Sequence, residues 1–348
     1  PNFLSQIESK NILSFPIYGV LIHAIFYSIF GIYSFVLLDF ILKFLFYVIL
    51  YKVFLEVFED KKKSILFCLT ILFTYIFFKF FSLNTEINFF YYIYDSLNNN
   101  FGNRMPRPLV TGIFYFLFYL LLFRLEDKIK TKINFSYVLI IFFLLSCFLN
   151  SFFYYFINFS VLLFGLFLFY TRGKFFGVLL ENGKNLFFGF ILFFIFLLPF
   201  IFQIYFGEED YSQRLGVITI NLDQKIFLTK YYLLNLLRKE PLIIILACTF
   251  IHIFINLSNL FDQRKVKKIN LFFYFIIASI ISPMLFFIFS PKIVSIYHFL
   301  DILFFGCLFY IILNVYNLIY QNISSIFSNL NFNFVILFLF LIFISSSF

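Results

Sequence analysis

The sequence predicts an all-α fold, a polytopic transmembrane helical bundle of about ten spans plus one interfacial helix. Hydrophobic residues make up 63% of the 348-residue chain and charged residues only 12%, whereas soluble domains carry roughly 25% charged residues. Apolar runs of the roughly 20 residues that a bilayer crossing needs recur along the whole chain. Short and mostly basic loops separate these runs.

The apolar runs place the spans in order along the chain. The expected spans are 34–55, 64–82, 109–123, 134–150, 152–170, 186–206, 241–257, 270–289, 299–320 and 333–348. The run 15–31 is interrupted by Pro16, Gly19 and Gly31, so we expect a re-entrant or interfacial helix there. We expect residues 1–348 to form a single integral membrane domain and to be a fragment of a longer chain, because the sequence ends within an apolar run.

The basic loops predict the orientation. Loops 59–63, 124–132, 171–184 and 258–269 hold 14 of the 26 Lys and Arg residues, and the span order puts all four on one side. The positive-inside rule makes that side cytoplasmic and makes loops 83–108 and 207–240 external. Topology therefore explains most of the net charge of +9, and we expect no nucleic-acid partner.

Arg104 and Arg107 precede the span at 109–123, and Pro106 stiffens the backbone between them. Two guanidinium groups held near the outer interface suit a lipid phosphate, because arginine offers a planar fork of donors to oxyanions. Anchoring of the span by arginine side chains that reach the headgroups explains the pair equally well.

His298 and Asp301 lie at the outer mouth of the span 299–320, next to Lys292 in the turn 290–298. On a helix the two residues are one turn apart and can share a hydrogen bond. A histidine oriented by a carboxylate is a general-base arrangement. It is also a common interfacial polar pair, and the sequence favours that simpler interpretation.

Other polar or unusual residues have structural explanations. Asp39 and Lys43 are four residues apart within a span, where charges usually pair inside the bundle. We expect His23 and His252 to be packed polar residues, and the 66 Phe residues to be filler that faces lipid. The four cysteines lack metal-site spacing and are expected to be buried small residues.

The segment 15–54 is the part of the chain that resembles a known family. An apolar residue precedes Pro16 and Tyr18, an apolar helix leads to Phe30–Gly31, and a further helix leads to the basic loop Glu59–Lys63. This order resembles a segment of the GT-C-type glycosyltransferases, which take sugars from polyprenyl-phosphate donors. Two features depart from the family. Asp39 and Lys43 stand where the family has an arginine, and Glu8 is the only acidic residue in the part of the catalytic-aspartate loop that this sequence contains.

The resemblance implies inverting sugar transfer at the extracytoplasmic face of a membrane, and we expect that membrane to be the bacterial inner membrane. The partners would be a polyprenyl-phosphate-linked sugar and a lipid or glycan acceptor. Acidic candidates are Glu86, Asp95 and Asp210, with His298 and Asp301 as the alternative base. Arg104, Arg107, Lys292 and Arg214 would stabilise the departing lipid phosphate. A divalent metal is optional, because the carboxylates are scattered in sequence and indicate no metal site.

Two other classes stay open. A transporter or flippase would gather polar residues at the bilayer midplane, where the sequence offers few. An O-antigen polymerase or ligase would use a long external segment between late spans, as 207–240 is. A non-catalytic membrane scaffold is the third alternative. No nucleotide-binding loop, zinc-protease motif or CxxC pair is present in the sequence to favour a further class.

Overall fold

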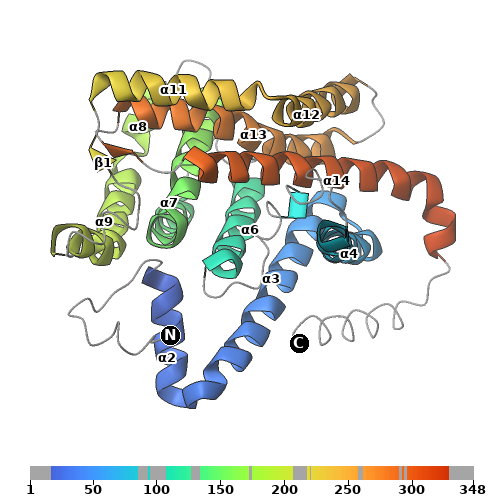
Figure 1. The fold of residues 1–348 in the computed structure, drawn as a ribbon, viewed down its shortest axis with the longest axis horizontal. Coiled ribbons are helices and arrows are strands. Elements are labelled where there is room, and N and C mark those ends of the chain that lie inside the picture. Colours follow the sequence, from blue (N-terminus) through green and yellow to red (C-terminus); the bar gives the residue numbers. More distant parts are fainter. Residues whose placement is uncertain are drawn as a thin grey trace.

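The computed structural model describes residues 17–84, 93–94, 107–126, 134–171, 175–206, 218–219, 221–257, 262–289, 292–293 and 296–328. This part of the chain is helical apart from two short strands (Figure 1). The elements are α2 (Ile17–Phe30), η1 (Gly31–Tyr33), α3 (Ser34–Phe58), α4 (Lys61–Asn84), α6 (Arg107–Glu126), α7 (Phe135–Thr171), α8 (Phe175–Glu181), α9 (Gly183–Phe206), β1 (Ile218–Thr219), α11 (Leu222–Leu236), α12 (Lys239–Leu257), α13 (Gln263–Phe289), β2 (Lys292–Ile293) and α14 (Ile296–Ser328).

Several helices are long and apolar enough to cross a membrane, so the all-α, polytopic membrane class is as predicted. Six such stretches occur among the described residues: Tyr18–Phe58, Lys61–Ser82, Phe135–Thr171, Gly183–Phe202, Gln263–Ile288 and Tyr297–Gln321. The pair Leu222–Leu236 and Pro241–Leu257, bent by 67°, makes seven if it is one span. Thr111–Leu125 is a shorter apolar helix. This is fewer than the predicted count of about ten, and the predicted span 333–348 lies outside the described residues.

The chain reverses inside α7. Phe152 has φ −149° and ψ 88°, which is extended backbone between two helical halves. The rings of Phe148 and Phe159 are 4.8 Å apart, although eleven residues of straight helix would separate them by roughly 16 Å. The two halves, 135–151 and 153–171, therefore pack against each other, at the boundary expected between the spans 134–150 and 152–170.

Helices α2 and α3 meet in a V whose apex is η1 (Figure 1). Gly31 has φ +57°, a left-handed conformation that residues with a side chain rarely adopt. The reversal separates α2 from α3, as the interruptions at Pro16, Gly19 and Gly31 predicted for the run 15–31. The Tyr18 hydroxyl then donates to the Phe196 carbonyl at 2.9 Å, which joins α2 to α9.

Two helices contain an internal proline, and tyrosines from other helices bond to the backbone just before each one. Pro283 in α13 cannot donate to the carbonyl of Ser279, four residues earlier. That carbonyl accepts the Tyr232 hydroxyl of α11 at 3.3 Å. In α9, three residues before Pro199, the Phe196 carbonyl accepts Tyr18. The Ser279 carbonyl, which Pro283 frees, thus has the internal partner that a backbone group within a bilayer needs.

One end of the bundle gathers the ends of helices that lead into the predicted cytoplasmic loops; we call it the basic end. Lys268 of α13 lies 3.9 Å from Glu56 and 3.6 Å from Glu59, and Arg124 of α6 lies 3.8 Å from Glu56. The Lys268 ammonium also donates to the Glu56 carbonyl at 2.6 Å. Residues from three separate predicted loops thus meet at a single end.

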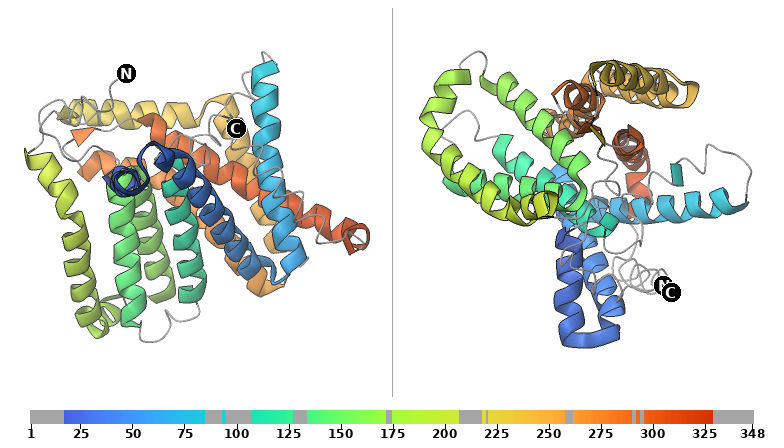
Figure 2. Two further views of the ribbon diagram at one scale, coloured as in Figure 1. Left: turned by 90° about the horizontal axis from the view of Figure 1, so that it is seen from below. Right: turned by 60° about the vertical axis from the view of Figure 1, so that its left-hand side comes forward.

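Helix α11 lies across the opposite end, at a steep angle to α6, α7 and α9 (Figure 2, left). Its start is capped reciprocally by Asn221 and Gln224. Tyr231 of α11 lies with its hydroxyl 3.2 Å from that of Tyr297, next to His298 at the start of α14. We call this end of the bundle the His298 end.

Aromatic side chains fill the interior between α3, α6, α7, α13 and α14. Tyr119 stacks on Phe272 with ring centroids 4.2 Å apart, and Phe54 and Phe116 are fully buried. Others, such as Phe169 at 67% exposed, face outward. The interpretation of phenylalanine as lipid-facing filler was therefore wrong for much of this core. All four cysteines are free and buried.

Candidate functional site

The structure describes only part of the predicted site. Glu86, Asp95, Arg104, Asp210 and Arg214 lie outside the described residues. Arg107 is the first residue of α6, and Lys292 lies in β2. His298 and Asp301 are the two predicted site residues whose side chains are placed, both in the first turns of α14.

His298 and Asp301 face each other. The Nδ1 atom of His298 is 3.6 Å from a carboxylate oxygen of Asp301, and the two side chains are 41% and 28% exposed. This distance suits an ion pair with a protonated imidazole but is too long for a hydrogen bond. The imidazole ring meets the rings of Phe152 and Tyr154 edge-on, at 5.3 and 5.0 Å. The reversal of α7 thus supplies an aromatic wall on one side of the pair.

Two predicted external segments meet beside this pair. Strands β1 and β2 are antiparallel, with Ile218 opposite Ile293 and Thr219 opposite Lys292. The Lys225 ammonium donates to the Ile288 carbonyl at 3.5 Å. Segment 207–240 and the turn 290–298, which are far apart in sequence, are therefore joined at the His298 end.

The start of α6 lies at the same end as the start of α14. Helix α13 is antiparallel to both, because aromatic rings near its start contact later turns of α6 and α14, whereas rings further along contact earlier turns. The ring pairs are Phe272–Phe123, Phe272–Phe309, Tyr115–Phe275 and Phe287–Phe299. Arg107 and His298 therefore begin their helices at one end of the bundle, as the proposed site requires.

Three of the polar groups within the predicted spans have polar partners. Lys43 lies 2.6 Å from Asp39, which confirms the predicted pair. His252 stacks on Phe273 at 3.7 Å and bonds with the Tyr310 hydroxyl at 3.1 Å, so it is a packed polar residue as predicted. The ring nitrogens of His23 are buried, and among the described residues they have no hydrogen-bond partner.

A buried lysine at the basic end was missed by sequence reasoning. Lys63 is 9% exposed, and its ammonium donates to the side chain of Asn317 in α14. The same ammonium lies 4.7 Å above the Phe58 ring and 5.1 Å above the Tyr320 ring. No local pattern distinguishes this lysine, because Lys61, Lys62 and Lys63 form one basic run and only the third is buried.

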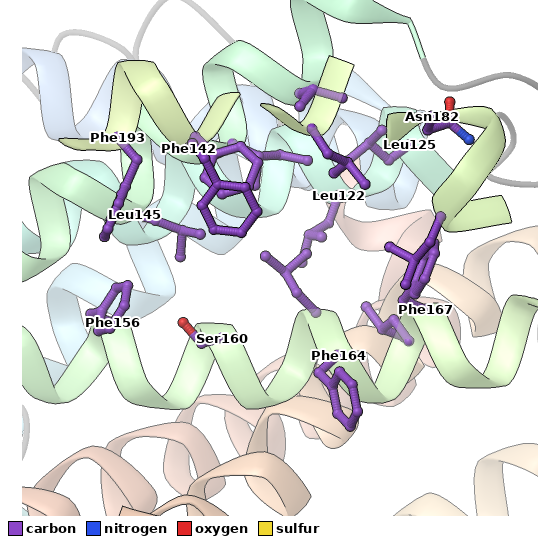
Figure 3. A pocket seen from close by; sticks show the side chains of 17 residues that line it. Leu122, Leu125, Phe142, Leu145, Phe156, Ser160, Phe164, Phe167, Asn182 and Phe193 are labelled. Carbon is purple, nitrogen blue, oxygen red and sulfur yellow. The ribbon is translucent and has the colours of Figure 1, made fainter. Parts of the chain in front are cut away.

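A cavity of about 400 Å³ lies between α6, both halves of α7, α8 and α9 (Figure 3). Its lining is apolar apart from Ser160 and Asn182. His298 and Asp301 do not line it, so the cavity is separate from the predicted site. In the described part of the chain, no three His, Cys, Asp or Glu side chains are grouped as a metal site would need.

Comparison with protein-family models, with curated proteins and with solved structures finds no match for this chain. The geometry of the His298 end therefore stands on its own.

Proposed function

We propose that this protein is a membrane glycosyltransferase that moves a sugar from a polyprenyl-phosphate donor at the extracytoplasmic face. The observation that carries the proposal is the meeting of the His298–Asp301 pair with two predicted external segments at one end of the bundle. A polar pair beside an aromatic wall, at the end where these segments join, is a suitable place for an acceptor hydroxyl and a sugar.

The proposed chemistry uses His298 as the base. Its imidazole accepts the proton of the acceptor hydroxyl as that oxygen attacks the anomeric carbon and the bond to the lipid phosphate breaks. Asp301, 3.6 Å away, stabilises the imidazolium that forms. Glu86 and Asp95 are the alternative bases. Arg107 and Lys292, together with Arg104 and Arg214, would balance the negative charge of the departing phosphate.

We further propose that the chain crosses the inner membrane of a bacterium ten times. Single crossings by α3, α4, α6, α9, α12, α13 and α14, with two by α7, give nine in the described part, and 333–348 would be the tenth. The reversal at Phe152 supports counting α7 twice. Charge bias supports a cytoplasmic basic end and an external His298 end.

A transporter or flippase ranks second. It would need polar groups free to bind cargo near the midplane, whereas Asp39 pairs with Lys43 and His252 packs on Phe273 and Tyr310. An O-antigen polymerase or ligase would use the same His298 end, with 207–240 as its long external segment, and would differ in transferring a glycan chain.

The test is an assay in proteoliposomes of bacterial phospholipid, with radiolabelled polyprenyl-phosphate sugars as donors and cell-envelope glycolipids as acceptors. Release of polyprenyl phosphate and transfer of label are measured for the native protein and for His298→Gln and Asp301→Asn. We expect His298→Gln to lower kcat by about 100-fold or more. Glu181→Gln, an exposed carboxylate at the end of α8, is the matched control and should leave kcat unchanged.

Normal turnover by both His298→Gln and Asp301→Asn would show that the pair has no role in catalysis. Uptake of label into the vesicle lumen without a new glycosidic bond would contradict the transferase function and favour a transporter.

A further inference from the structure

The cavity between α6, α7, α8 and α9 is too apolar to hold ordered water. Ser160 and Asn182 are the two polar side chains among its lining residues, and the Asn182 amide already donates to the Val178 carbonyl. A buried water needs two to four polar partners, and apolar cavities lined by Leu, Ile and Phe stay dry and take apolar ligands. An empty cavity, in turn, costs packing free energy in proportion to its volume.

The cavity opens toward the outer surface of the helices. Phe164 and Phe190 both line it, yet their side chains are 57% and 50% exposed, so they flank its mouth. The adjoining surface of α9 carries Phe187, Phe194 and Ile195, each more than half exposed. Helix α9 is also the least buried of the six candidate spans. In a bilayer this mouth faces hydrocarbon.

The cavity is a defined gap and not general loose packing. At Gly189, α9 touches the first half of α7 so closely that a Cβ atom would lie 2.3 Å from the Phe142 ring. Phe193 of α9 also lies 5.8 Å from Phe156, ring to ring. Between these contacts and Asn182, the walls separate and leave the space that Ser160 points into (Figure 3).

We infer that this cavity binds one acyl chain of a membrane phospholipid, which enters between Phe164 and Phe190. An acyl chain matches the apolar lining and comes from the medium that surrounds the mouth. Phe152 and Tyr154, the α7 residues that contact His298, do not line the cavity, so we assign it to a resident lipid and not to the sugar donor. The inference does not depend on the proposed glycosyltransferase activity.

The absence of tryptophan from the sequence permits a clean test. Phe156→Trp places a single fluorophore at the cavity wall, and Phe169→Trp places one on the outward surface of the same half of α7, where Phe169 is 67% exposed. Both proteins are reconstituted with phospholipid brominated on its acyl chains, which quenches nearby tryptophan. We expect quenching at both positions.

The blocking variant is Ser160→Phe, which adds a ring inside the cavity. On the Phe156→Trp background it should at least halve the quenching, and on the Phe169→Trp background it should change nothing. Ile191→Phe adds a comparable ring on the outer surface of α9, where Ile191 is 40% exposed, and should have no effect on either reporter. Ser160→Leu, a smaller addition, gives a second blocking variant should Ser160→Phe fail to fold.

Native mass spectrometry supplies an independent count. The native protein should retain one phospholipid after delipidation, and Ser160→Phe or Ser160→Leu should lose it. Absence of quenching at Phe156→Trp, or quenching that both blocking variants leave intact, would overturn the inference. Quenching by brominated polyprenyl phosphate but not by brominated phospholipid would also overturn it, because the occupant would then be an isoprenyl chain.

Discussion

The hydroxyl of Tyr232 donates a hydrogen bond to the carbonyl of Ser279, the group that Pro283 leaves without its helical partner. Tyr232 is fully buried, and its oxygen also lies 3.4 Å from the Ile280 carbonyl. Helix α11 is therefore fastened to α13 next to Pro283, and the turn 290–298 begins about two helical turns after that proline.

Tyr232→Phe should destabilise the protein by about 1–3 kcal/mol, because a buried carbonyl loses its donor. Thermal unfolding of the detergent-purified protein measures the loss. The double variant Tyr232→Phe/Pro283→Ala should recover part of it, since residue 283 would regain an N–H for the Ser279 carbonyl. Additive losses in the two single variants and the double variant would show that the hydroxyl and the proline act independently.

Tyr18→Phe should destabilise the protein less than Tyr232→Phe does, as measured by the same thermal unfolding. The Phe196 carbonyl that accepts Tyr18 also accepts the Asn150 amide at 3.1 Å, so it keeps one partner after the substitution. The loss of stability in the double variant Asn150→Ala/Tyr18→Phe should exceed the sum of the losses in the two single variants. An equal loss for Tyr18→Phe and Tyr232→Phe would argue against this sharing.

Asn317→Leu should destabilise the protein by about 1.5–3 kcal/mol, because the buried ammonium of Lys63 loses a charge-assisted hydrogen bond. Lys63→Met/Asn317→Leu should be more stable than Asn317→Leu alone, since it removes the buried charge as well. Lys62→Met, at the neighbouring exposed position, is the matched control and should change the melting temperature little. A larger loss in the double variant than in Asn317→Leu would contradict this account.

Sidedness can be tested by labelling introduced cysteines with an impermeant maleimide, because the four native cysteines are buried. Lys230→Cys on α11 should react in intact cells, and Lys62→Cys at the basic end should react only after the membrane is permeabilised. This outcome follows from the positive-inside rule. Reaction of both positions from one side would refute the proposed topology and, with it, an extracytoplasmic site.

Local sequence patterns predicted what depends on neighbours along the chain. The spacing of Asp39 and Lys43 predicted their ion pair, and Gly31 predicted the break before α3. The boundary near Ser151 anticipated the reversal at Phe152. The positive-inside rule put the loops 59–63 and 258–269 on one side, and residues at their edges, Glu56 and Lys268, lie close together. Each of these features depends on residues within about one helical turn, or on which residues the membrane and the water on either side accept.

Features that depend on contacts between distant helices could not be predicted in this way. Nothing near Tyr232 in the sequence indicates that its partner is a carbonyl in α13, and nothing in the run Lys61–Lys63 indicates that Asn317 selects the third lysine. The same limit applies to the cavity, which exists because α9 approaches α7 at Gly189 and diverges elsewhere. The His298–Asp301 spacing was local, whereas the aromatic wall from α7 was not.

The two backbone partners that join β1 to β2 make a mechanical tether. Because β2 precedes α14 along the chain, a displacement of β1 would act through the Thr219–Lys292 pairing on the segment that leads to His298.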